Sequence, residues 1–301
     1  MQVADALSAD EWELVTSDAF VPLTCVSFEA DFSGHIEHER LDDSTSINHL
    51  TTSGIAVDRT ARQAAHANAD DIHITLTLGG SGVVRQDGRG VRVRAGSVTT
   101  YATDRSYQLD YTKPRQRQVL VQVSKRALGI PLDVVERSCE QLLVAPGAAT
   151  EVLFETIAET RRSPTPGADA GFAQTVRDLA GTMIRSSVSG TRVMPTTRGG
   201  LLATVRSFIR GNLRSPELDV AQIAEAHFVS RRFLYELFEP LSETPGEHLR
   251  RLRLRRAAEL LADPMPSIAQ VAERSGFADP TTFTRAFHRE FGMLPREFRH
   301  S

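Results

Sequence analysis

The chain has 301 residues, of which 41% are hydrophobic and 24% charged, the balance of an ordinary globular protein with room for two domains. It has no run of eighteen apolar residues, which excludes a membrane-spanning helix, and its acidic start lacks the basic segment of a secretory signal, so we expect a cytoplasmic protein with no membrane partner. The formal net charge of −3 is unevenly distributed: residues 201–301 carry +2, from 15 arginines against 13 acidic residues, and residues 1–200 carry −5.

Short strands and turns are predicted for the first 124 residues. Leu14–Phe28 and Thr51–Val57 are compatible with early strands, and residues 58–70 with a polar loop. From Asp71, four aliphatic residues alternate with polar ones, which is the two-residue period of a strand. Asp87-Gly88 separates two further apolar segments and is a strong signal of a tight hairpin. The expected strands are 71–78, 83–86, 90–94, 97–101, 107–111 and 118–123, a set typical of a sandwich or barrel.

The pattern changes to helices after Ser124. Helical segments are expected at residues 132–143, 148–162 and 168–189. Thr191–Gly200 contains a proline and paired glycines, which is typical of a linker. We therefore expect a β domain over residues 1–124, a helical segment over 125–197 and a C-terminal domain over 198–301.

The C-terminal region repeats itself. Residues 220–225 (VAQIAE) match residues 268–273 (IAQVAE) at an offset of 48. Asp219 and Ser267 precede the two copies as suitable helix caps, and Ser230 and Asp279 do the same for the helix that follows in each copy. Each copy, 219–245 and 267–295, is therefore predicted to be a helix-turn-helix.

The second helix of each copy, which we call its reading helix, has a polar exposed face. A repeated interaction hairpin in a helical bundle is the alternative to a DNA-binding motif, because helix pairs alone are common. The exposed residues favour DNA, since they are cationic or hydrogen-bonding side chains suited to base edges and phosphates. They are Arg231, Arg232, Tyr235 and Glu236 in the first copy and Thr281, Thr282, Arg285, His288 and Arg289 in the second.

One helix, Glu247–Ala262, is predicted to join the two copies. A continuous helix is rigid, so it would fix the distance between the reading helices, and successive major grooves on one face of DNA lie roughly 34 Å apart. Its arginines are suited either to phosphate contacts or to a solvated helix face. They are Arg250, Arg251, Arg253, Arg255 and Arg256.

Residues 201–300 resemble the DNA-binding domain of the AraC/XylS family of bacterial transcription regulators. The resemblance is carried mainly by Ser267–Phe298 (SIAQVAERSGFADPTTFTRAFHREFGMLPREF), and Pro245–Leu261 (PGEHLRRLRLRRAAELL) also fits. The first copy departs from the family, which usually has glycine at the position of Phe228 and a basic residue where this chain has Glu239-Pro240. The first copy is therefore expected to turn or end differently.

The resemblance also implies which positions contact bases. They correspond to Arg232, Tyr235 and Glu236 in the first reading helix and to Thr281 and Arg285 in the second. Arg285 would pair with a guanine and Glu236 would accept from a cytosine amino group. His288 and Arg289 are expected at phosphates.

The N-terminal half resembles the cupin-like sensor domain of the same family, so the expected fold class is α+β, with a β-barrel or sandwich, a helical dimerisation segment and an all-α DNA-binding domain. The resemblance implies that the partners are double-stranded promoter DNA, a small-molecule effector, a second copy of the chain through residues 148–189, and RNA polymerase. An activator of transcription is expected, although the residues themselves do not distinguish activation from repression.

The barrel is not expected to be an enzyme or to hold a metal or cofactor. His35, Glu37, His38 and Glu39 are metal-ligand types, but they precede the recognisable strands. His73 is the one histidine among those strands, and we expect it to point outward. Cys25 and Cys139 are too few for a metal cluster and are expected as buried thiols.

A closed barrel still forms a pocket or a core. The residues expected either to line such a pocket or to fill the core are Ile72, Ile74, Leu76, Leu78, Tyr101, Tyr107 and Tyr111. The alternative to a regulator is a small-molecule-binding or enzymatic cupin whose helical tail serves protein interaction.

Overall fold

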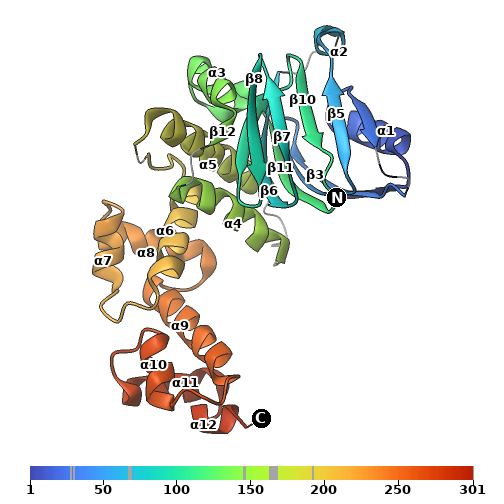
Figure 1. Cartoon of the computed structure of the whole chain (residues 1–301). Coiled ribbons are helices and arrows are strands. Elements are labelled where there is room, and N and C mark those ends of the chain that lie inside the picture. Colours follow the sequence, from blue (N-terminus) through green and yellow to red (C-terminus); the bar gives the residue numbers. More distant parts are fainter. Residues whose placement is uncertain are drawn as a thin grey trace. The chain divides into compact units, whose positions relative to one another are not determined.

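The computed structural model describes the chain except residues 28, 30, 67–69, 145–146, 163–168, 192 and 301 and the side chains of 169 and 170. It consists of two compact units, unit 1 (residues 1–200) and unit 2 (residues 201–301). Unit 1 contains the β-strands and unit 2 is helical, so the predicted α+β class is confirmed (Figure 1).

Two antiparallel sheets face each other in unit 1. Their strands are β1 (Gln2–Ala6), β2 (Thr24–Ser27), β3 (Gly34–Asp42), β4 (Thr45–Thr52), β5 (Ile55–Arg59), β6 (Asp71–Gly79), β7 (Ser81–Gln86), β8 (Arg89–Arg94), β9 (Val98–Ala102), β10 (Tyr107–Tyr111), β11 (Gln116–Ser124) and β12 (Leu143–Val144). The larger sheet has the order β1-β3-β4-β11-β6-β9-β12 and the smaller β2-β5-β10-β7-β8. Buried side chains from both sheets, such as Tyr101 and Tyr107, form one core between them.

The hairpin predicted at Asp87-Gly88 is confirmed. The two residues connect β7 to β8, and both have positive φ, 52° for Asp87 and 73° for Gly88. Aspartate and glycine tolerate this left-handed backbone better than other residues, which is why the pair predicts a two-residue turn.

The prediction for the first 66 residues was partly wrong. Leu14–Phe28 was expected to hold an early strand, and it holds β2, but its first residues belong to helix α1 (Ala9–Ala19), which was not predicted, and Phe28 lies outside the described residues. Ser8 caps α1, because its Oγ accepts from the Glu11 amide at 3.2 Å, and Glu11 Oε2 accepts from the Leu7 amide at 2.7 Å. A serine three residues before a glutamate is a helix-start signal that would have identified α1.

Two other expectations for this region also need correction. Thr51–Val57, expected to hold a single early strand, spans the end of β4 at Thr52 and the start of β5 at Ile55. Residues 58–66, expected as a loop, hold the end of β5 and helix α2 (Ala61–His66), and residues 67–69 lie outside the described part of the chain. His35 and Glu39, expected before the barrel strands, lie in β3, which is hydrogen-bonded on both sides.

The first half of strand β6 is buried on both faces, and its polar face points inward, which reverses the orientation predicted for it. His73 is only 1% exposed and lines the space between the sheets, so it points inward rather than outward. Ile72 and Ile74 are on the opposite face by strand alternation and are fully buried as well. Helices α3 (Leu132–Gln141) and α5 (Asp169–Ser189) contact strands of this larger sheet and provide the cover that the aliphatic face needs.

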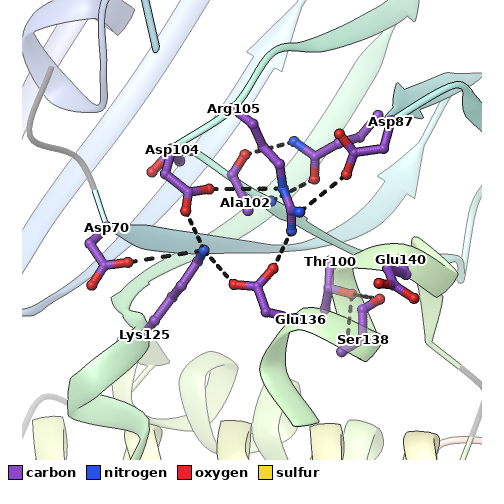
Figure 2. Close-up of polar contacts among 12 residues, drawn as sticks. Asp70, Asp87, Thr100, Ala102, Asp104, Arg105, Lys125, Glu136, Ser138 and Glu140 are labelled. Carbon is purple, nitrogen blue, oxygen red and sulfur yellow. Dashed lines mark hydrogen bonds and ion pairs between the residues drawn. The ribbon is translucent and has the colours of Figure 1, made fainter. Parts of the chain in front are cut away.

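An ion cluster around the buried Lys125 side chain attaches α3 to the barrel. The Lys125 ammonium, at the start of the short helix η1 (Lys125–Leu128), has a side chain that is 3% exposed and lies 2.6 Å from Asp104 and 2.7 Å from Glu136 of α3. Figure 2 shows Glu136 between Lys125 and Arg105, which also forms an ion pair with it. Burial of the ammonium opposes its charge, but the hydrogen bonds to Asp104 and Glu136 raise the pKa of Lys125 above its ordinary value.

Unit 2 consists of helices. They are α6 (Arg198–Asn212), α7 (Val220–Ala226), α8 (Arg231–Phe238), the short η2 (Glu239–Leu241), α9 (Pro245–Leu261), α10 (Ile268–Arg274), α11 (Pro280–Phe291) and α12 (Pro295–Phe298). The side chain of a capping residue sets the start of five of them, α7 to α11. The four predicted caps are confirmed: Asp219 caps α7, Ser230 caps α8, Ser267 caps α10 and Asp279 caps α11. Helix α4 (Ala148–Arg162) and α5 likewise match the helices predicted at 148–162 and 168–189.

Replacing Lys125 by methionine is expected to lower the free energy of unfolding of unit 1 by roughly 1–3 kcal/mol, because Asp104 and Glu136 then lose their shared cation. Urea denaturation of the full chain measures the change. The matched control is Lys113→Met, at the other lysine of the chain, which is exposed. Equal effects of the two substitutions would contradict the structural role of the cluster.

Candidate functional site

The reading helices α8 and α11 each begin at a side chain that accepts backbone hydrogen bonds. Ser230 Oγ accepts from the Phe233 amide at 3.1 Å, and Asp279 Oδ2 accepts from the Thr282 amide at 2.7 Å. The Thr282 hydroxyl also donates to Asp279, and these hydrogen bonds lower the pKa of the Asp279 carboxyl below its ordinary value. Each cap fixes where its helix starts, and therefore which residues lie on the exposed face.

The first reading helix presents the four residues predicted for it. Leu234, Leu237 and Phe238 are buried against unit 2, and the candidate residues lie on the other side of the helix. Arg231, Arg232 and Tyr235 are exposed, whereas Glu236 is half-buried. Glu236 accepts from Arg232 Nε at 2.9 Å, so these two side chains act as a pair.

The second reading helix presents a larger set. All five predicted residues are exposed, and the helix buries Phe283, Ala286 and Phe287 on its opposite side. The Thr282 hydroxyl proton is used in the cap, which leaves its oxygen as an acceptor. The exposed residues are Thr281, Thr282, Arg285, His288 and Arg289.

The turns of the two copies have the same backbone geometry. In the second copy Gly276 has φ +89°, and in the first Phe228 has φ +55°. The hydrogen bonds correspond: Val229 N donates to Ala224 O at 3.0 Å, and Phe277 N donates to Ala272 O at 2.9 Å. The difference expected in the turn or the end of the first copy therefore does not lie in its turn, although Phe228 is 91% exposed in a conformation that favours glycine.

The ends of the two reading helices do differ. Helix α8 has eight residues and is followed by η2, which contains Pro240, whereas α11 has twelve residues and ends at Gly292 with φ +73°. Proline prevents α8 from continuing, because it lacks an amide proton and restricts the residue before it. The first reading helix is thus shorter by a full turn.

Most of the arginines in α9 bind groups of unit 2 rather than pointing into solvent. Arg251 donates to Glu243, Arg253 donates to backbone carbonyls before α7, and Arg256 pairs with Glu259. Arg250 and Arg255 are exposed. Phosphate contacts and a solvated helix face, the two interpretations of the arginine run, therefore both remain open only for Arg250 and Arg255.

A cavity of about 50 Å³ lies between the two sheets of unit 1. Tyr101, Tyr107 and Tyr111 line it as predicted, but Ile72, Ile74, Leu76 and Leu78 do not. His73 takes their place, and neither of its ring nitrogens has a hydrogen-bond partner. Alternation alone predicts a solvated face for the polar residues of β6, whereas the helices predicted after Ser124 indicate that the other, aliphatic face is the covered one.

The His73 ring is held by aromatic neighbours. It makes edge contacts with Phe20 and Tyr101, with ring centroids 5.4 and 5.3 Å away. Burial lowers the pKa of His73 to about 3, and the charge of Arg59 acts in the same direction, so the imidazole is neutral at pH 7. The Tyr111 hydroxyl faces Gln118, but neither the hydroxyl nor the Gln118 amide nitrogen reaches a hydrogen-bond partner.

The residues considered as metal ligands are engaged elsewhere. His35 Nδ1 lies 2.7 Å from Asp5, His38 Nδ1 lies 2.6 Å from Asn48, and Glu37 accepts from Arg161. Within the described ranges, no group of three histidine, cysteine or acidic residues is arranged to hold a metal ion. Cys25 and Cys139 are buried thiols. No helix in the part of the chain that the structure describes is long and apolar enough to cross a membrane.

Comparison with known proteins identifies both units. The family model of an AraC-binding-like domain matches residues 12–187, and that of a helix-turn-helix domain matches residues 216–301. The chain is 28% identical over 231 residues to the transcriptional activator NphR of a Rhodococcus species, covering 75% of this chain and 69% of NphR. It is 37% identical over 84 residues to the HTH-type transcriptional activator RhaS of Shigella boydii, covering 28% of this chain and 30% of RhaS.

A solved structure supports the fold. The AraC-like transcriptional activator CuxR aligns with a TM-score of 0.51 and 18% identity, covering 85% of this chain and 95% of CuxR. NphR and RhaS are transcription regulators, which favours a regulator over the alternative of a small-molecule-binding or enzymatic cupin with a helical interaction tail.

The stability of unit 1 is expected to fall in acid because of His73. Its pKa is about 3 when folded and about 6.5 when unfolded, so below pH 6.5 the unfolded chain binds a proton that the folded chain does not. The contribution is fully present above pH 6.5 and is lost at up to about 1.4 kcal/mol per pH unit as the pH falls toward 3.

Urea denaturation at several pH values gives the free energy of unfolding as a function of pH for the wild type and for His73→Gln. The variant should lose the part of this pH dependence between pH 6.5 and 3 that comes from His73. His66→Gln, at an exposed histidine of α2, should keep it. An unchanged slope in His73→Gln would contradict a neutral buried imidazole.

Proposed function

The chain belongs to the AraC family of DNA-binding transcription regulators, and from this premise we propose that it activates transcription by reading promoter DNA with α8 and α11 and that a small-molecule effector binds inside its barrel. The observation that carries the DNA-reading proposal is the pair of capped helices with cationic and hydrogen-bonding exposed faces. We further propose a domain division at residues 124 and 197, a homodimer formed through residues 148–189, and contact with RNA polymerase.

Helix α11 supplies the more complete reading surface. Arg285 lies one turn after Thr281 on the exposed face, where its planar guanidinium suits the two acceptors of a guanine. His288 and Arg289 lie a further turn along the helix and suit phosphates, which accept from any cation regardless of sequence. Base preference therefore depends chiefly on the first turns of α11.

Helix α8 uses a coupled pair. Because Glu236 accepts from Arg232 within the free protein, the arginine holds the carboxylate in one orientation toward the exposed face. A carboxylate in that place suits a cytosine amino group, and Tyr235 beside it offers a hydroxyl that both donates and accepts. We expect the shorter α8 to contribute fewer contacts than α11.

The barrel cavity suits a small, largely apolar effector with one or two hydrogen-bonding groups. Its walls combine aromatic and aliphatic side chains, and His73, Tyr111 and Gln118 present polar atoms that lack protein partners. A buried polar atom without a partner costs about 1–3 kcal/mol, which a ligand that bonds to it recovers. The cavity of about 50 Å³ is well below the few hundred Å³ of a typical ligand site, so binding requires the lining side chains to move.

Selection of DNA from a random duplex library by the full chain tests the DNA-reading proposal, and absence of any enriched sequence at moderate salt would reject it. On the enriched site, Arg285→Ala is expected to weaken binding by about 1–3 kcal/mol and to relax the preference at one base pair. Arg289→Ala is its matched control on the same face: it should weaken all sequences alike and reduce the salt slope by about 1. A uniform loss in Arg285→Ala would make that residue a phosphate contact.

The effector proposal predicts a ligand whose binding depends on His73. Thermal unfolding is measured with a panel of small neutral molecules that combine an apolar body with a hydrogen-bonding group. A binder should raise the Tm of the wild type and of His66→Gln but not of His73→Gln. It should also change the affinity of the protein for DNA by the same factor by which bound DNA changes the affinity of the protein for the binder. A Tm rise that persists in His73→Gln would place the binder outside this cavity.

A further inference from the structure

The backbone carbonyl of Leu213 is a point where three segments of unit 2 meet. Leu213 directly follows α6, in the segment that leads into the first helix-turn-helix. Arg253 of α9 donates from Nε to this carbonyl at 2.9 Å. Gly276, in the turn of the second helix-turn-helix, lies so close that an added Cβ would be 2.0 Å from the same oxygen.

Arg253 binds the whole connection before α7 and not one carbonyl alone. Its Nη2 donates to Ser215 O at 2.6 Å and to Leu218 O at 3.3 Å. Leu218 immediately precedes Asp219, the cap of α7. The planar guanidinium can donate in several fixed directions at once, which a lysine ammonium on a flexible stem cannot reproduce.

Through Gly276, the turn of the second copy packs closely against the same Leu213 carbonyl. The φ of +89° at Gly276 favours glycine, and its hypothetical Cβ would also lie 2.8 Å from Arg253 Nε. The lack of a side chain therefore serves the turn and, separately, the close approach of the two copies. A side chain here would have to displace a backbone carbonyl.

Hydrophobic packing does not link the two copies into one core. The first has a cluster that includes Ile223, Leu234 and Leu249, and the second has a separate cluster that includes Leu254, Val271 and Phe283. Helix α9 connects these clusters. A helix fixes a distance, but the rotation of each copy about it depends on side contacts such as the one at Leu213.

We propose that the contact among Arg253, the Leu213 carbonyl and Gly276 fixes the rotation of α8 relative to α11, and thereby the number of base pairs between the two DNA segments that this protein recognises. This inference rests on the proposed reading of DNA by both helices. Arg253 is then a positioning residue for specificity, acting without touching DNA. One extra base pair moves a half-site by about 3.4 Å and rotates it by roughly 34°, so a fixed reader tolerates only one spacing.

The test uses the full chain and the bipartite site that it selects from a random duplex library. Affinity is measured for the selected duplex and for duplexes with one or two base pairs inserted or removed between the half-sites. The wild type should lose about tenfold or more per base pair of change, comparable to a mismatched base. Arg253→Lys should lose roughly threefold or less per base pair, because its two copies rotate more freely.

Arg255→Lys is the matched control, at an exposed arginine of the same helix. Lysine keeps the positive charge that a phosphate contact would use, and Arg255 does not join the two copies, so its spacing profile should be that of the wild type. Gly276→Ala is a second variant, expected to shift or flatten the profile by displacing Leu213. Circular dichroism and binding to the isolated α11 half-site check that each variant is folded.

The outcomes are distinct. If Arg253→Lys weakens binding equally at every spacing, or if the wild type tolerates all spacings, Arg253 does not set the spacing and the inference is overturned. If the wild type selects no DNA sequence at all, the proposed function fails instead. A flattened profile in both Arg253→Lys and Gly276→Ala, with an unchanged Arg255→Lys, supports it.

Discussion

Helix α9 has to supply two hydrophobic cores at once, and the arrangement of unit 2 depends on that constraint. Leu249 packs into the first core and Leu254 into the second, five residues or about 7.5 Å apart along the axis. Such close succession leaves little of the helix free for solvent. It also explains why Arg251 and Arg253, between those leucines, bind protein acceptors on either side.

In unit 1, strand β6 likewise has to pack against other elements on both of its faces. Over its first half, strand β6 is covered on its aliphatic face by helices and encloses His73 on its polar face, whereas Leu78 near its end is 46% exposed. The helical cover needs an attachment at the rim of the barrel, and the cluster of Lys125, Asp104 and Glu136 provides one. Burying an ammonium is costly unless acidic groups surround it, so the cluster also specifies where α3 docks.

The sequence predicts features that depend on local chemistry. The caps of α7, α8, α10 and α11, the hairpin at Asp87-Gly88 and the helices at 148–162 and 168–189 each follow from a few neighbouring residues. The inward orientation of His73 does not, because alternation gives two faces without saying which one meets the helices. Arg253 could not be recognised as a positioning residue either, since its acceptors are carbonyls forty residues away, such as that of Leu213.

The turn at Phe228 shows how far backbone hydrogen bonding can override residue preference. A left-handed backbone costs a non-glycine residue roughly 1–2 kcal/mol, and Phe228 recovers none of this by burial because its side chain is 91% exposed. The turn persists because the hydrogen bonds of Val229 and Phe228 to the end of α7 match those of Phe277 and Gly276 to α10.

The two copies therefore share their turns and differ at their ends. A fixed relation between the two copies would also constrain how the proposed effector acts. A ligand shifts an equilibrium only by its difference in affinity between two states. If Arg253 and Gly276 hold α8 and α11 in one relation, those states differ in whether the reader engages DNA, and not in the spacing that it recognises.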